Sequence, residues 1–78
     1  MSQIDKIVQF HINRLKDRSV DVQLKSIHEL QLLGAQAESA MPALRELFET
    51  SENVDVKRAA QQAGIVIFTK SKDASEQG

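Results

Sequence analysis

A short sequence pattern occurs twice in this chain, and the matched positions, such as Val22 and Val56, lie 34 residues apart. Ser19-Val20-Asp21-Val22 and Asn53-Val54-Asp55-Val56 each place a good helix-capping residue before Val, Asp and Val. An amphipathic segment precedes each copy and another follows it. A period near 34 with two helices per unit is typical of α-solenoids, in which stacked hairpins bury a face that none could bury alone. The repeat therefore predicts an all-α fold, a superhelix of two helical hairpins.

The apolar residues of the first unit recur at helical spacing in two segments. Residues 4–15 form the first amphipathic pattern, and Ser2 stands where it can cap that helix. The second pattern covers residues 19–34. It ends at Gly34, and glycine commonly supplies the left-handed residue that follows a helix. These features predict an antiparallel hairpin with a short charged turn between its helices.

The second unit repeats this organisation. Its first helix is expected over residues 38–50, with Pro42 in the first turn, where a missing amide hydrogen costs least. Its second helix is expected over residues 54–69. We therefore predict one two-repeat domain of four helices over residues 1–69. Residues 70–78 are polar and small, and we predict a disordered tail there.

Composition excludes several classes of protein. The chain of 78 residues has room for one domain, and it contains no cysteine, so disulfides and thiolate zinc sites are excluded. A formal charge of −1 provides no global field that would attract nucleic acid or an anionic membrane surface. The chain start lacks the features of a secretory signal, and no segment has the roughly 20 apolar residues of a membrane span. We expect a soluble, cytoplasmic protein.

No catalytic motif is present. His11 and His28 are the only histidines, each on a predicted helix without neighbouring metal ligands. The glycines are isolated, so there is no phosphate-binding loop, and no serine lies in a strand-turn-helix context that would make it a nucleophile. We predict a protein that is not an enzyme, with no catalytic residue, no cofactor and no metal site.

Three kinds of motif carry a family resemblance. Residues 37–48 (AESAMPALRELF) have the apolar pattern and the proline of the first helix of a repeat. Asp21-Val22-Gln23 and Asp55-Val56-Lys57 have the Asp, Val start of the second helix, and residues 30–34 (LQLLG) have the ending of a helix. Together these motifs resemble the HEAT repeat family, particularly the short bacterial type also found in phycobilisome lyase subunits. The resemblance covers about residues 4–68.

The chain departs from the family pattern at four positions. Gln23 and Lys57 replace the usual arginine, which predicts a weak or missing hydrogen-bond ladder between the repeats. Gly64 stands where the first repeat has Leu30, which predicts a gap or a close approach of helices, and Phe68 stands at the position of Gly34. The family resemblance implies a protein-binding scaffold.

The resemblance also implies which surface binds a partner. In the family, the second helices of the hairpins line the inner groove. We therefore expect contacts with a partner protein, of unidentified kind, from these residues: Gln23, Ser26, Ile27, Lys57, Gln61 and Gln62.

A second candidate surface lies near the end of the fourth helix. Residues 65–68 are consecutively apolar and cannot all point to one side of a helix. Either the first helix or the tail covers this surface, or it is an association surface. In the second case Ile65, Val66 and Phe68 are candidate contacts, and self-association across a two-fold axis is one way to complete the core.

Two other functions remain open. The chain could be a non-catalytic subunit of an enzyme complex such as a bilin lyase. It could also bind nucleic-acid backbones through a basic helix-turn face, although acidic residues interrupt that face and the chain has no Tyr or Trp to stack on bases. The basic residues concerned are Arg14, Lys16, Arg18 and Lys25.

Overall fold

The computed structural model describes residues 2–77, with side chains described as far as Ala74, and it contains no strand in that part of the chain. The all-helical class predicted from the sequence is confirmed. The elements in chain order are α1 (Gln3–Arg14), α2 (Val20–Leu33), the 3-10 helix η1 (Gly34–Ala40), α3 (Met41–Thr50) and α4 (Val54–Gln77).

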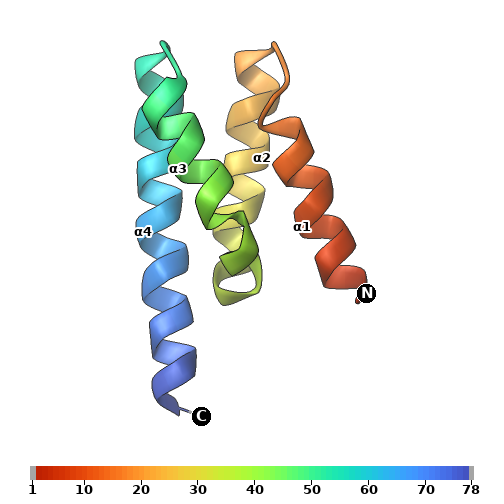
Figure 1. Ribbon diagram of the computed structural model, residues 1–78, viewed down its shortest axis with the longest axis vertical. Helices are drawn as coiled ribbons and strands as arrows, with labels where there is room; N and C mark the ends of the chain where they lie inside the picture. The colour runs from red at the N-terminus through yellow and green to blue at the C-terminus, as the bar shows by residue number, and fades with distance from the viewer. Residues whose placement is uncertain (1, 78) are drawn as a thin grey trace.

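The helices alternate in direction along the chain (Figure 1). α1 and α2 are antiparallel neighbours joined by a short turn, and α3 and α4 are joined in the same way at the same end of the molecule. α2 and α4 contact one another and run in the same direction. η1 connects α2 to α3 at the opposite end, where it packs against α1, α2 and α4.

Side chains cap the helices at the positions that the sequence pattern indicates. The Oδ1 atom of Asn53 accepts the Val56 N–H at 3.0 Å, and Oγ of Ser19 accepts the Val22 N–H at 3.4 Å. Ser2 forms a reciprocal capping box with Asp5 at the start of α1. Because the cap lies at the equivalent position of each repeat, α2 and α4 begin in register with one another.

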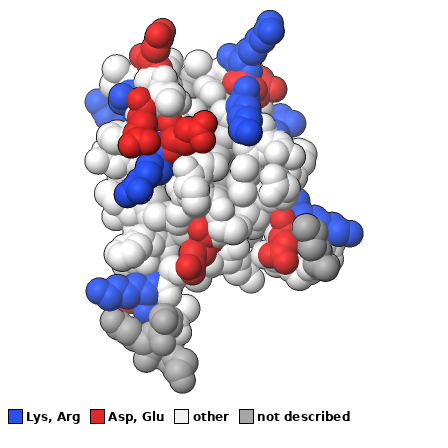
Figure 2. All heavy atoms as spheres, in the orientation of Figure 1, with Lys and Arg blue, Asp and Glu red and all other residues white. Residues whose placement is uncertain are grey.

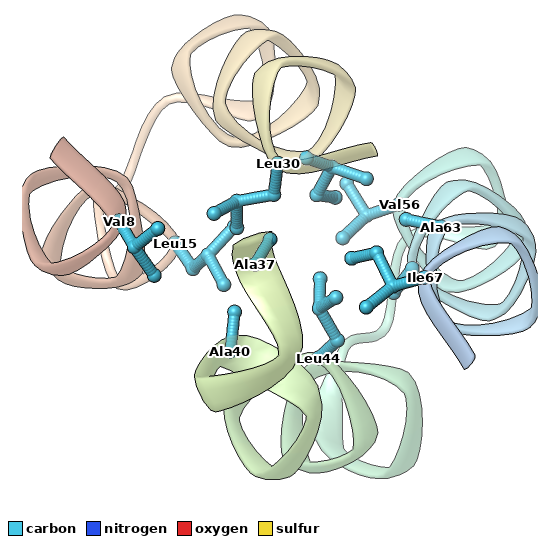
Figure 3. Packing of buried hydrophobic residues seen from close by; sticks show 11 residues of the cluster. Val8, Leu15, Leu30, Ala37, Ala40, Leu44, Val56, Ala63 and Ile67 are labelled. Atoms are coloured by element: carbon cyan, nitrogen blue, oxygen red, sulfur yellow. The ribbon is translucent and has the colours of Figure 1, made fainter. Parts of the chain in front are cut away.

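The core lies between the helices and receives side chains from every element (Figure 3). η1 fills the centre with two small residues, because alanine lets its backbone approach the surrounding helices closely. The buried apolar residues are Val8, Leu15, Ile27, Leu30, Ala37, Ala40, Leu44, Val56, Ala60, Ala63 and Ile67.

The segment between the repeats, residues 34–40, forms the 3-10 helix η1. α3 therefore begins at Met41 rather than at residue 38 as expected. Gly34 adopts a positive φ of 59°, as predicted for a residue that ends a helix. Pro42 lies in the first turn of α3, also as predicted.

The disordered tail predicted for residues 70–78 is not found, because α4 continues to Gln77; Gly78 lies outside the described residues. The added turns are held against the end of the first repeat. The Ser71 hydroxyl donates a hydrogen bond to the Glu38 carboxylate, and Lys70 lies beside Gly34. A polar segment that pairs with another element can therefore extend a helix without contributing an apolar face.

Candidate protein-binding surface

Two of the residues expected to contact a partner belong to the core instead. Ser26 is 1% exposed and Ile27 is 2% exposed. Oγ of Ser26 lies 3.4 Å from Nδ1 of His11, so α1 covers this side of α2. Ile27 belongs to the same buried cluster as Val56 of α4. The prediction of these two residues as partner contacts is wrong, because neighbouring helices occupy both sides of α2.

Gln23 and Lys57 stand at equivalent positions and each reaches back to the preceding helix of its own hairpin. The Nε2 atom of Gln23 donates to the Leu15 carbonyl at 2.9 Å. The Lys57 ammonium lies 5.3 Å from the centre of the Phe48 ring, a cation–π contact. Both side chains are half-buried. They join the two helices of a hairpin, which is a role within the fold.

The remaining predicted contacts lie on α4 and are mostly accessible. Gln61 and Gln62 are exposed, Ile65 is 55% exposed and Phe68 is 60% exposed, whereas Val66 is half-buried. Neither α1 nor the C-terminal continuation of α4 covers Ile65 and Phe68. Of the two alternatives that the sequence leaves open for this apolar run, the uncovered surface is the one found.

Six exposed residues of α4 share one narrow side of the helix, which we call the α4 stripe. Its members are separated alternately by four and three residues, a spacing that keeps them on the same side through five turns. The sequence analysis predicts three members of the α4 stripe, Gln61, Ile65 and Phe68, as contacts. The same four-and-three spacing, counted from the first residue of α4, would have indicated the other three. The α4 stripe consists of Val54, Arg58, Gln61, Ile65, Phe68 and Lys72, all exposed.

The repeat relates the α4 stripe to a covered side of α2. A shift of 34 residues takes Val20, Ile27 and Gln31 of α2, and Gly34 that caps its C-terminus, onto four members of the α4 stripe, namely Val54, Gln61, Ile65 and Phe68. These four residues of the first repeat are buried or half-buried, and their counterparts on α4 are all exposed. α2 contacts α4, and the end of this side lies against Lys70 of α4. The α4 stripe is thus the side on which another helix would pack if the arrangement continued.

The side of the molecule away from α4, formed by α1 and α2, presents a different surface. A shallow groove between α1 and α2 has Phe10 and Arg14 on one wall and Lys25, His28 and Glu29 on the other. The Arg14 guanidinium lies 5.2 Å from the centre of the Phe10 ring. The lining of this groove carries charge of both signs.

The basic residues considered for nucleic-acid binding do not form a uniform surface. Arg14 and Lys25 flank the groove between α1 and α2, while Lys16 and Arg18 lie in the turn between these helices. Asp17 separates the two turn residues, and its carboxylate accepts the Ser19 N–H at 2.8 Å. Figure 2 shows acidic and basic side chains interspersed at the end of the molecule that carries the α1–α2 and α3–α4 turns. The local charge is mixed.

A hollow of about 300 Å³ lies between the loop-side ends of α1 and α3. Ile12, Leu15 and Leu47 contribute apolar surface to it, and Lys16 and Glu46 contribute charged groups. It arises because η1, rather than α3, makes the contacts that fill the space beside α1.

Gly64 leaves open space on α4. A Cβ atom added there would meet nothing within 4 Å, so of the two alternatives raised for this position the gap is found and the close approach is not.

Among the described residues, no three His, Cys, Asp or Glu side chains are grouped so that they could hold a metal ion. None of the helices between residues 2 and 77 combines the length and the apolar content needed to cross a bilayer. Comparison with protein-family models, curated proteins and solved structures gives no match to this chain.

Proposed function

We propose that this chain is a non-catalytic protein–protein interaction module, an adaptor or scaffold built as a short solenoid of HEAT type. The two repeats would be α1 with α2 and α3 with α4. The proposal is supported by the parallel contact between α2 and α4 and by the equivalent caps at Ser19 and Asn53. A chain without cysteine suits a reducing compartment, and we propose that the module works in the cytoplasm.

One observation carries the proposal. The side of α2 that packs on α4 has an exposed counterpart, the α4 stripe, on which Ile65 and Phe68 are more than half exposed. Apolar anchors at helical spacing on one side of a helix are the feature by which helices pack into a partner's surface. The partner would supply a helix that packs along the α4 stripe. A non-catalytic subunit of a larger enzyme complex would use the same surface.

The matched variants Ile65→Asp and Leu32→Asp test this function. Leu32 is 67% exposed on α2 and lies outside the α4 stripe, so it controls for the loss of an exposed apolar side chain. Proteins retained from native cell extract by the wild-type chain would be identified, purified and measured against both variants by calorimetry. We expect Ile65→Asp to weaken binding by at least about tenfold and Leu32→Asp to change it little. A purified partner bound equally by wild type and Ile65→Asp would overturn the proposal.

A further inference from the structure

We propose that the α4 stripe binds the α4 stripe of a second copy of this chain, with the two α4 helices antiparallel across a two-fold axis. This inference rests on the proposed function in one respect, that the α4 stripe is a binding surface. It goes further because it names the occupant and the orientation of that occupant.

The geometry of the α4 stripe fits a two-helix contact. Its alternating separations of four and three residues give the 3.5-residue period at which two helices keep contact along their length. α4 has 24 residues, which corresponds to about 36 Å of helix. The six side chains of the α4 stripe span most of that length and all are exposed. α4 is therefore long enough and regular enough to pair with a copy of itself.

The charges on the α4 stripe select the antiparallel orientation. Parallel pairing in register would set Arg58 against Arg58 and Lys72 against Lys72, and like charges in facing positions are destabilising. Antiparallel pairing about an axis between Gln61 and Ile65 sets Arg58 against Phe68 of the second copy. It also brings Lys72 to the beginning of the second copy's α4, where Asp55 lies in the first turn. Each cation then meets an aromatic ring or a carboxylate.

The chain already contains two cation–π contacts of the kind that this orientation would place between Arg58 and Phe68. Arg14 lies over the Phe10 ring and Lys57 lies over the Phe48 ring at distances of 5.2 and 5.3 Å, respectively. A guanidinium over a half-exposed ring contributes favourably in water and more when the pair is desolvated. Arg58 and Phe68 would make two such pairs, one on each side of the two-fold axis.

Continued stacking of hairpins, which is the alternative way to cover the α4 stripe, meets a poor surface. The side of α4 that faces the core includes Ala63, which is buried, and Ala59, which is partly buried. The positions 34 residues earlier hold Lys25 and Glu29, both exposed. A second copy placed head to tail would have to desolvate these two charges without the close approach that alanine allows. The symmetric contact avoids this cost and closes the assembly as a dimer.

Sedimentation equilibrium of the full chain, from micromolar to sub-millimolar concentration, tests the self-association. We expect a monomer–dimer equilibrium for the wild type. Phe68→Asp and Ile65→Asp should each raise the dissociation constant at least about tenfold, and Leu32→Asp should leave it close to the wild-type value. Circular dichroism would verify that all variants remain folded. A wild-type chain that is monomeric throughout, or a dimer that both stripe variants leave intact, would overturn the inference.

The orientation is tested by cross-linking, which is simple because the chain has no cysteine. In the antiparallel dimer, residue 54 faces residue 72 of the second copy, and the two residues 54 are about 27 Å apart, from 18 helical rises of 1.5 Å. A short bis-maleimide reagent should therefore link Val54→Cys to Lys72→Cys in a mixture of the two variants. It should not link Val54→Cys to itself. Efficient self-linking of Val54→Cys would contradict the antiparallel arrangement.

The outcomes separate this inference from the proposed function. A monomeric chain whose partner binding is lost in Ile65→Asp overturns self-association and supports the interaction module. A dimer that dissociates in Ile65→Asp, with partner binding unchanged, supports self-association and overturns the placement of the partner on the α4 stripe.

Discussion

The side-chain amide of Gln23 donates a hydrogen bond to the main-chain carbonyl of Leu15 at 2.9 Å, which ties the start of α2 to the end of α1. The carbonyls at a helix C-terminus have no partner inside the helix, so a side chain from the next element satisfies one of them here. The equivalent residue of the second hairpin, Lys57, contacts the Phe48 ring instead. One position in the repeat thus performs the same task in two chemical ways.

Replacing Gln23 with alanine should lower the free energy of unfolding by about 1 kcal/mol, because the carbonyl of the buried residue Leu15 loses its side-chain hydrogen-bond donor. Urea denaturation would measure the change. Gln62→Ala is the matched control, since Gln62 is exposed on α4 and should stay within about 0.5 kcal/mol of the wild type. Equal stability of the two variants would show that the Gln23 contact does not support the hairpin.

Replacing Asn53 with alanine should destabilise the chain by about 1 kcal/mol, since the Val56 N–H at the start of α4 loses its acceptor. Asn53→Asp retains an acceptor and should remain near wild-type stability. Thermal unfolding followed by circular dichroism compares the two variants. A cap that can be removed without loss of stability would count against the equivalence of Asn53 and Ser19.

The two described glycines should respond oppositely to substitution by alanine. Gly34→Ala should destabilise by about 1 kcal/mol or more, because the positive φ of 59° is unfavourable for a residue with a Cβ atom. Gly64→Ala should stabilise by about 0.5 to 1 kcal/mol, because Gly64 is inside a helix and an added Cβ meets nothing within 4 Å. Denaturation of the two single variants measures both signs. A destabilising Gly64→Ala would mean that another group approaches this part of α4.

Truncation at the two equivalent positions Ile27 and Gln61 should have very different effects. Ile27→Ala removes a side chain that is 2% exposed and should cost about 2 to 5 kcal/mol, through lost burial and the cavity left behind. Gln61→Ala removes an exposed side chain and should be close to neutral for folding. Chemical denaturation of both variants tests the comparison. Similar losses would contradict the exposure of Gln61 and of the side of α4 on which it lies.

The local features of the fold follow from the sequence. Ser2, Ser19 and Asn53 were predicted as caps or cap equivalents, and each accepts a hydrogen bond at a helix start. Gly34 was predicted to end a helix and has the positive φ that this role favours. These predictions succeed because capping and helix termination depend on residues within three or four positions of one another. Information of that kind is contained in the order of the residues.

The sequence by itself determined that this chain forms helices, where most of them begin, and that residues 19–34 and 53–68 are related by a shift of 34. Only the tertiary structure decided which side of each helix is covered. Ile27 and Gln61 are equivalent in the repeat, yet α4 packs beside α2 and no element of residues 2–77 packs beside the corresponding side of α4. Tertiary contact also decided that α4 continues past Thr69, through the pairing of Ser71 with Glu38. Burial depends on neighbours that are distant in the chain, so a repeated pattern can predict equivalent helices but cannot predict equal exposure.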